Sequence, residues 1–260
     1  MSPAVSPAIR ITSTDDAADD DDEQQQSPFT LPKLRLEFRD ITHPGAKLFF
    51  SSLNATEVIT RAAANVLRLL YRSPSDPTTN VPPTRSVTFI FRDMPGVAYT
   101  TGSELDDDHK EVHFALDHIS KMDRARTRSE VEGVVTHELV HCLQWNAQGT
   151  CPGGLIEGIA DWVRLHCGLV PPHWKREVRE KWDDGYQHTA YFLDYLEKRF
   201  GEGFVRRLNE ELRVAKYHEK TFWSELTGTT VCHLFQDYVA YLEDDERQSA
   251  QAEGELEEAS

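Results

Sequence analysis

The spacing of hydrophobic residues predicts strands early in the chain. Residues 34–41 (LRLEFRDI) alternate between apolar and polar side chains, as a half-buried strand does. A second strand is predicted at residues 87–91, and shorter strands at residues 97–101 and 111–116. An acidic turn at residues 104–108 separates the last two. We therefore expect a small sheet in the first half of the chain.

Helical spacing governs residues 55–71 and almost everything after Arg126. In the first of these segments, apolar residues recur one turn apart at Val58, Ala62, Val66 and Leu69. A Pro-rich surface loop follows at residues 73–83. The later helices are predicted near residues 129–148, 154–167, 187–200, 203–215 and 230–242. This order favours an α+β fold, in which a small, mostly antiparallel N-terminal sheet with a helix precedes a helical half.

Acidic residues gather at the two ends of the chain. The formal net charge is −16, of which residues 1–30 and 243–260 together carry −13. Such segments bury too little apolar surface to offset chain entropy, so we expect disordered tails at residues 1–30 and 244–260. One domain is then expected at residues 31–243. The acidic balance argues against nucleic acid and anionic lipid as partners, and no apolar run is long enough to span a membrane.

The cysteines and the N-terminal sequence bear on the cellular compartment. No secretory signal is visible, so we expect a cytoplasmic protein with free buried thiols rather than disulfides. The four cysteines are Cys142, Cys151, Cys167 and Cys232. Asn54 begins a glycosylation sequon, but for the same reason we interpret it as the N-cap of the helix that follows.

A metal-binding pattern, His137-Glu138-Leu139-Val140-His141, lies inside one predicted helix. Ser129 and Glu132 are placed to form a capping box at the start of this helix, and Gly149 is placed to end it. Histidines at i and i+4 share one helical face, so both imidazoles can reach a single Zn²⁺. Glu138, next to the first histidine, can lean over the open side of the metal, where a water molecule binds.

A second pair of residues, on the next predicted helix, can supply a third metal ligand and a carboxylate that orients a ligand histidine. Glu157 and Asp161 are also at i and i+4, in the stretch Glu157-Gly158-Ile159-Ala160-Asp161. Glu157 is predicted to be the third zinc ligand, which leaves the fourth position open, as catalytic zinc requires. Asp161 is predicted to accept a hydrogen bond from the nitrogen of a ligand histidine that does not face the metal.

Several longer segments resemble the plant basic secretory protein family. They are residues 137–149 (HELVHCLQWNAQG), 152–168 (PGGLIEGIADWVRLHCG), 185–209 (GYQHTAYFLDYLEKRFGEGFVRRLN) and 221–231 (TFWSELTGTTV). The resemblance covers about residues 34–242, and the family is described as zinc metallopeptidases of plants, bacteria and fungi. The metal pattern also resembles the wider gluzincin type, in which HExxH is joined by a downstream Glu in an ExxxD pattern.

The resemblance implies a zinc peptidase with His137, His141 and Glu157 as ligands of one Zn²⁺ per chain and Glu138 as the catalytic acid/base. The family is typically basic and exported, so secretion is the alternative to a cytoplasmic location. The peptide or protein substrate is not identified by the resemblance, since this chain is acidic. A non-catalytic, zinc-stabilised binding or defence-type protein is the alternative function, and we expect a monomer.

Further residues are expected to line the substrate cleft. Zinc peptidases need a donor for the oxyanion that develops on the scissile carbonyl, and Tyr186 is our first choice for it, with His188 second. Trp174 and Trp182 are candidates for the cleft wall. An edge strand at residues 97–101 or 111–116 could pair with an extended substrate. Two other tryptophans, Trp145 and Trp162, are expected in the core.

Overall fold

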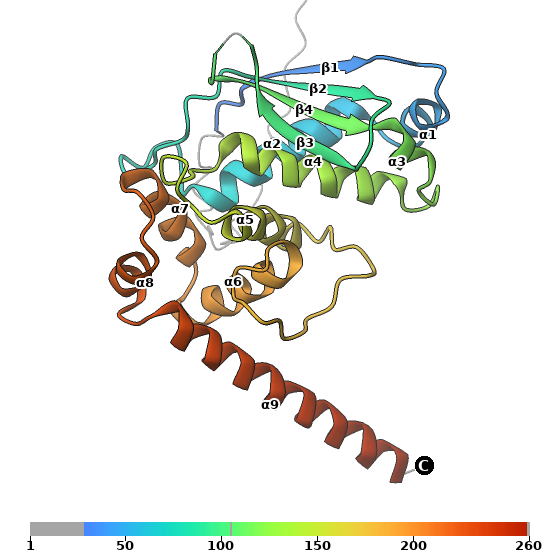
Figure 1. Cartoon of the computed structure of the whole chain (residues 1–260). Coiled ribbons are helices and arrows are strands. Elements are labelled where there is room, and N and C mark those ends of the chain that lie inside the picture. The colour runs from blue at the N-terminus through green and yellow to red at the C-terminus, as the bar shows by residue number, and fades with distance from the viewer. Residues whose placement is uncertain (1–28, 105, 259–260) are drawn as a thin grey trace, which may run out of the picture.

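The computed structural model describes residues 29–104 and 106–258 and has the α+β architecture that the sequence predicts. The first part contains a four-stranded sheet with α1–α4, and the second part contains α5–α9 (Figure 1). The strands are β1 (Lys33–Phe38), β2 (Ser86–Arg92), β3 (Ala98–Gly102) and β4 (His109–Ala115). The helices are α1 (Pro44–Ser52), α2 (Ala55–Leu70), α3 (Leu116–Ser120), α4 (Thr127–Leu143), α5 (Gly153–His166), α6 (Tyr186–Phe200), α7 (Phe204–Val214), α8 (Glu219–Thr227) and α9 (Val231–Glu258).

The sheet is mixed, so the prediction of a mostly antiparallel sheet is wrong. The strand order is β1-β2-β4-β3. β1 pairs with β2 and β2 pairs with β4 in parallel, and β3 alone runs antiparallel, against β4. The reason is the connection between β1 and β2. It contains α1 and α2, and a crossover of this length returns the chain to the same end of the sheet, as parallel pairing requires.

One face of the sheet packs on α2 and α4 (Figure 1). The apolar face predicted for α2 is confirmed, because Val58, Ala62, Val66 and Leu69 are all buried. The proposed cap is also present, since the Asn54 side chain accepts a hydrogen bond from the Glu57 N–H at 3.2 Å. At the N-terminal end of the described chain, Phe29 packs edge-on against Tyr71, with 6.5 Å between ring centroids.

The start of α4 differs from the capping box that the sequence suggested. The helix begins at Thr127, so Ser129 lies in its first turn, and its hydroxyl donates to the Arg126 carbonyl at 3.0 Å. The Glu132 carboxylate accepts two hydrogen bonds from Arg61, at 2.7 and 2.6 Å, and caps nothing. The helix also ends at Leu143, several residues before Gly149. The buried Glu132 carboxylate therefore pairs with the half-exposed Arg61 side chain of α2 instead of capping α4.

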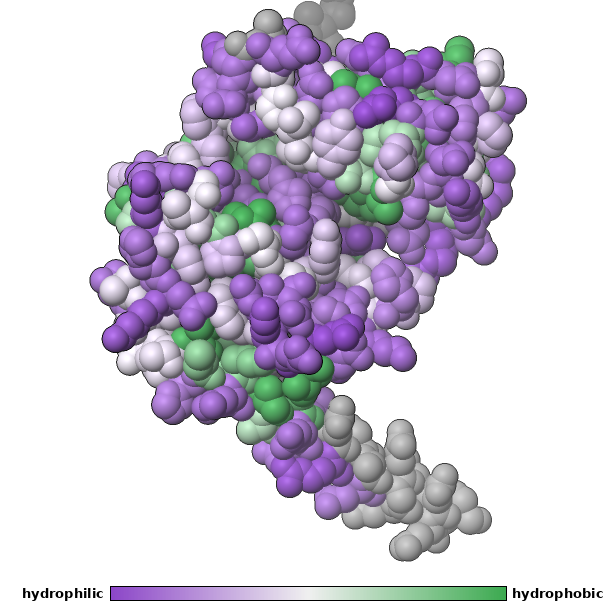
Figure 2. Space-filling model, viewed as in Figure 1, coloured by the Kyte–Doolittle hydropathy of each residue, from purple (hydrophilic) through white to green (hydrophobic). Residues whose placement is uncertain are grey.

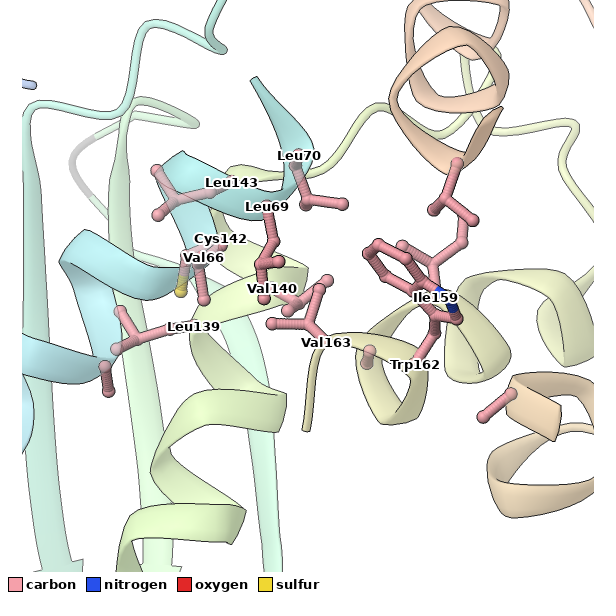
Figure 3. Close-up of a cluster of buried hydrophobic side chains, with 14 of the residues drawn as sticks. Val66, Leu69, Leu70, Leu139, Val140, Cys142, Leu143, Ile159, Trp162 and Val163 are labelled. Carbon is pink, nitrogen blue, oxygen red and sulfur yellow. The ribbon is translucent and has the colours of Figure 1, made fainter. Parts of the chain in front are cut away.

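α4 is the central helix of the molecule. It is buried on almost every side, because α2 and the sheet cover one flank and α5 covers the other. Figure 3 shows the apolar contact that joins the two parts, in which Trp162 and Val163 of α5 face Leu69 of α2 and Val140 of α4. A polar side chain on α4 is therefore held among packed neighbours.

The two ends of the chain bear on the predicted tails. Residues 1–28, which hold most of the predicted N-terminal tail, lie outside the described residues. α9 continues as a helix to Glu258, where the charge pattern predicted a disordered tail from residue 244 (Figure 1). Lack of apolar surface argues against packing, but Glu, Gln, Ala and Arg have high helix propensity, and a helix needs only local hydrogen bonds.

The cysteines and the helix lengths test two further predictions. The four cysteines are free thiols, as expected, but only Cys142 is buried. Cys151 and Cys167 are half-buried and Cys232 is exposed, so the expectation of buried thiols is wrong for these three. Among the described residues, no helix is both long enough and apolar enough to cross a membrane.

Candidate metal centre and its cleft

A cleft of about 1070 Å³ separates the sheet part from the helical part. It is lined by β3, by one face of α4 and of α5, and by the first residues of α6. Figure 2 shows a hollow between the two parts that is lined largely by hydrophilic residues. All seven site residues predicted from the sequence line this cleft: His137, Glu138, His141, Glu157, Asp161, Tyr186 and His188.

Three of these side chains converge on one point. His137 and His141 project from successive turns of α4, and Glu157 projects from α5 opposite them. The His137 Nε2 atom lies 3.1 Å from His141 Nε2 and 3.1 Å from Glu157 Oε2, and His141 Nε2 lies 3.6 Å from Glu157 Oε1. Ligand atoms about 2.0–2.1 Å from a tetrahedral zinc ion are ~3.3 Å apart, so these separations fit a shared zinc ion.

Asp161 supports His137 from behind. Its Oδ1 atom lies 2.7 Å from His137 Nδ1, and the Asp161 side chain is buried. A carboxylate accepts only, so the proton shared by this pair sits on Nδ1 and Nε2 is left to face Glu157 and His141. This is the tautomer that a metal ligand needs, and it is the contact that the ExxxD spacing predicted.

The charges of the two helices are strongly coupled. Burial opposes protonation of His137, but its hydrogen bonds with Asp161 and Glu157 outweigh burial and raise the pKa to about 9. Burial likewise opposes ionisation of Glu157, but its hydrogen bonds with His137 and His141 outweigh that effect and lower the pKa to about 2. In the absence of a metal, the positive charge of protonated His137 therefore stabilises the negative charges of Asp161 and Glu157.

Gln144 is a partner of the site that the sequence analysis missed. Its amide Nε2 lies 2.8 Å from His141 Nδ1, and its Oε1 atom is buried without a hydrogen-bond partner among the described residues. The two ends of an amide have nearly the same shape. A metal on His141 Nε2 requires the proton on Nδ1, and the amide oxygen would then have to face Nδ1. In this structure the amide nitrogen faces Nδ1 and also donates to the Ile156 carbonyl at 3.4 Å. Gln144 is the C-cap residue of α4, directly after Leu143, and it lies three positions after His141, so its proximity in the sequence was a usable signal.

Glu138 is buried although it points into the same cleft, with 5% of its surface exposed. Its Oε2 atom accepts a hydrogen bond from the Thr100 hydroxyl of β3 at 2.7 Å. None of the metal-ligand contacts described above involves Glu138. It can therefore act beside a metal held by the three ligands without joining them.

Tyr186 and His188 occupy different positions in the cleft. The Tyr186 ring lies nearly parallel to the His137 ring, with 6.1 Å between centroids, and its backbone φ is +48°, which is unusual for a residue other than glycine. The nearby negative charge of Glu157 raises the pKa of Tyr186, so its hydroxyl stays a donor. His188 instead accepts a hydrogen bond from Arg179 at its Nε2 atom, at 3.2 Å.

The tryptophans divide between the cleft and the core. Trp174 lines the cleft beneath the Arg164 guanidinium, whose carbon lies 5.5 Å from the ring centroid. Trp182 is buried and packs on Trp223, so its predicted place in the cleft wall is wrong. Trp162 is a core residue, as expected, and Trp145 is half-buried and packs against the core.

Comparison with known proteins gives one result. A family model described as BSP, peptidase of plants and bacteria, matches residues 31–238. No curated protein and no solved structure gives a significant match. The matched range covers most of the chain and includes every residue of the cleft described above.

Proposed function

Because the chain belongs to the BSP family of peptidases of plants and bacteria, we propose that it is a zinc-dependent peptidase with one metal ion per chain. The observation that carries this proposal is the convergence of His137, His141 and Glu157 beside the buried carboxylate of Glu138. Two imidazoles and one carboxylate are the ligand set of many catalytic zinc sites, which keep the fourth position open.

Glu138 is the general base of the proposed reaction. A bound zinc ion would supply Lewis acidity and water with a pKa lowered to about 7. Glu138 would take a proton from the attacking water and later give it to the leaving amine. Its burial in the cleft wall keeps competing solvent away from the carboxylate.

Tyr186 is the better candidate for the oxyanion donor. Its ring is adjacent to His137, its hydroxyl is protonated, and its side chain is well exposed to the cleft, with 58% of its surface accessible. The nitrogen of His188 that faces Arg179 is already occupied. We therefore assign the donor role to Tyr186 and leave His188 to the cleft wall.

β3 is the strand that can pair with an extended substrate. It lies at the edge of the sheet and lines the cleft, whereas β4 is enclosed between β2 and β3. Of the two strands that the sequence analysis left open, only β3 has an edge that no other described strand pairs with. Backbone pairing along that edge would align a peptide with the metal ligands.

The test separates the metal from the chemistry. Purified protein should carry about one zinc per chain, and His141→Ala should lose most of it. Glu138→Gln should keep the zinc and lose activity about 10²- to 10⁴-fold on a proteome-derived peptide library. Glu211→Gln, an exposed carboxylate on α7, is the matched control and should behave as wild type. Equal zinc in His141→Ala, or wild-type cleavage by Glu138→Gln at equal zinc loading, would contradict the proposal.

A further inference from the structure

Thr100 places a hydroxyl group against the proposed general base. Its Oγ1 atom lies 2.7 Å from Glu138 Oε2 and 3.1 Å from the Glu138 backbone oxygen. A hydroxyl has one proton to donate, and the charged acceptor at the shorter distance binds it better. The hydrogen bond therefore goes to the carboxylate.

The position of Thr100 in the sheet makes this contact unusual. The row of side chains that crosses the covered face of the sheet consists of Leu36, Phe89, Val112 and Thr100, one from each strand. Phe89 and Val112 are fully buried. Thr100 is the polar member of an otherwise apolar row, and it stands where the row meets α4. A valine at this position would fill the same space, so packing does not explain the hydroxyl group.

We propose that Thr100 is a positioning residue that holds the Glu138 carboxylate for catalysis. Its hydroxyl fixes Oε2 and limits rotation of the carboxylate. Among the described residues, no side chain donates a hydrogen bond to Oε1, so this second oxygen is left to take the proton of the attacking water.

The same hydrogen bond controls where the transferred proton resides. When Glu138 takes a proton from water, Oε2 still accepts from Thr100, and the new O–H bond forms at Oε1. The proton is thus kept on the oxygen from which it must pass to the leaving amine. The proton moves from water to Oε1 and from Oε1 to the amine, and Thr100 keeps its own proton throughout.

This inference rests on the proposed peptidase function, and three substitutions test it. Thr100→Val keeps the shape and removes the hydroxyl, and Thr100→Ser keeps the hydroxyl and removes a methyl group. Thr88→Val is the control, because Thr88 lies between the buried Val87 and Phe89 of β2 and so faces the opposite side of the sheet.

The measurements are kcat and KM on one fluorogenic peptide, together with zinc content and melting temperature. Thr100→Val should lower kcat about 10- to 100-fold, as expected for loss of one hydrogen bond to a charged group, with KM and zinc content unchanged. Thr100→Ser should retain kcat within about threefold, and Thr88→Val should match wild type. If Thr100→Val does not fold, the comparison is made between Thr100→Ser and Thr100→Ala.

A double-mutant cycle separates positioning from simple packing. If Thr100 acts through Glu138, Thr100→Val should not further lower the residual activity of Glu138→Gln. An additive loss, wild-type kcat in Thr100→Val, or equal impairment in Thr100→Ser would overturn the inference while the proposed function stands. A zinc-loaded wild type that cleaves no peptide, or Glu138→Gln that cleaves as fast as wild type, would overturn the proposed function and this inference with it.

Discussion

Zinc binding should displace a proton from His137. In the metal-free protein, His137 Nδ1 faces Asp161 and Nε2 faces Glu157, and the pKa of this histidine is raised to about 9. At pH 7 the protonated form of His137 therefore dominates. A metal ion needs the lone pair on Nε2, so it competes directly with that proton.

The magnitude of this competition depends on the pH range. Below a pKa of about 9, each pH unit should change the apparent zinc dissociation constant about tenfold, or ~1.4 kcal/mol, with tighter binding at higher pH. A histidine with an ordinary pKa near 6.5 would change it less than about twofold between pH 7 and pH 8. Glu157, with a pKa of about 2, stays ionised throughout this range and does not change the pH dependence of the zinc dissociation constant.

Two assays measure the displaced proton. Competition with a chelator of known pH dependence gives the apparent dissociation constant at pH 6, 7 and 8. Calorimetry in two buffers of different ionisation enthalpy counts the protons released, and we expect about one from His137 at pH 7. A zinc affinity that is flat between pH 7 and pH 8, with no proton release, would refute the coupling of His137 to Asp161 and Glu157.

The same shift has a consequence for the stability of the metal-free protein. The folded-state pKa of His137 lies above its unfolded value, so the folded chain binds more protons between the two values. The stabilisation is fully present below about pH 6.5 and is lost as the pH rises through about 9. Denaturant unfolding of the metal-free chain across this range would show the decline.

Other parts of the site and the chain ends can be tested in the same way. Asp161→Asn should weaken zinc binding about 10- to 100-fold in the chelator assay with the fold intact, and a wild-type affinity would contradict its supporting role. Gly154→Ala should lower kcat with zinc retained, because its Cβ would lie 1.7 Å from the Asp183 carbonyl oxygen and would push away the segment that leads to Tyr186. Gly153→Ala is the control and should match wild type, because its Cβ would meet nothing within 4 Å. A chain shortened to residues 29–243 should melt within a few degrees of the full chain, and loss of its cooperative transition would show that an end packs on the domain.

The parts of the site that the sequence predicted are those governed by helix geometry. His137 and His141 share a face because they are four residues apart, and the same holds for Glu157 and Asp161. The approach of α4 to α5 could be predicted without knowing the fold, because a catalytic zinc site needs a third ligand besides the two histidines. The structure then brings all four side chains together.

The features that the sequence did not predict depend on contacts between distant segments. The direction of β1 relative to β2 follows from the helices that connect them, and alternation within each strand carries no sign of it. Thr100 reaches Glu138 across 38 positions of sequence, and an isolated threonine in a strand has no pattern to mark it. Ser129 and Glu132 satisfy a local capping rule, but Glu132 instead pairs with Arg61, which lies 71 positions earlier in the sequence.

The glycines around Glu157 connect the metal ligands to the opposite wall of the cleft. A Cβ on Gly158 would meet the Thr189 side chain at 2.3 Å, so α5 and α6 can approach this closely only because the position has no side chain. Together with the similar contact of Gly154 with residue 183, this fixes the first turn of α6 beside Glu157. Tyr186 is the first residue of that turn. The stretch Gly-Gly-Leu-Ile-Glu-Gly therefore encodes two things at once, a proposed metal ligand and the distance at which the proposed oxyanion donor stands from it.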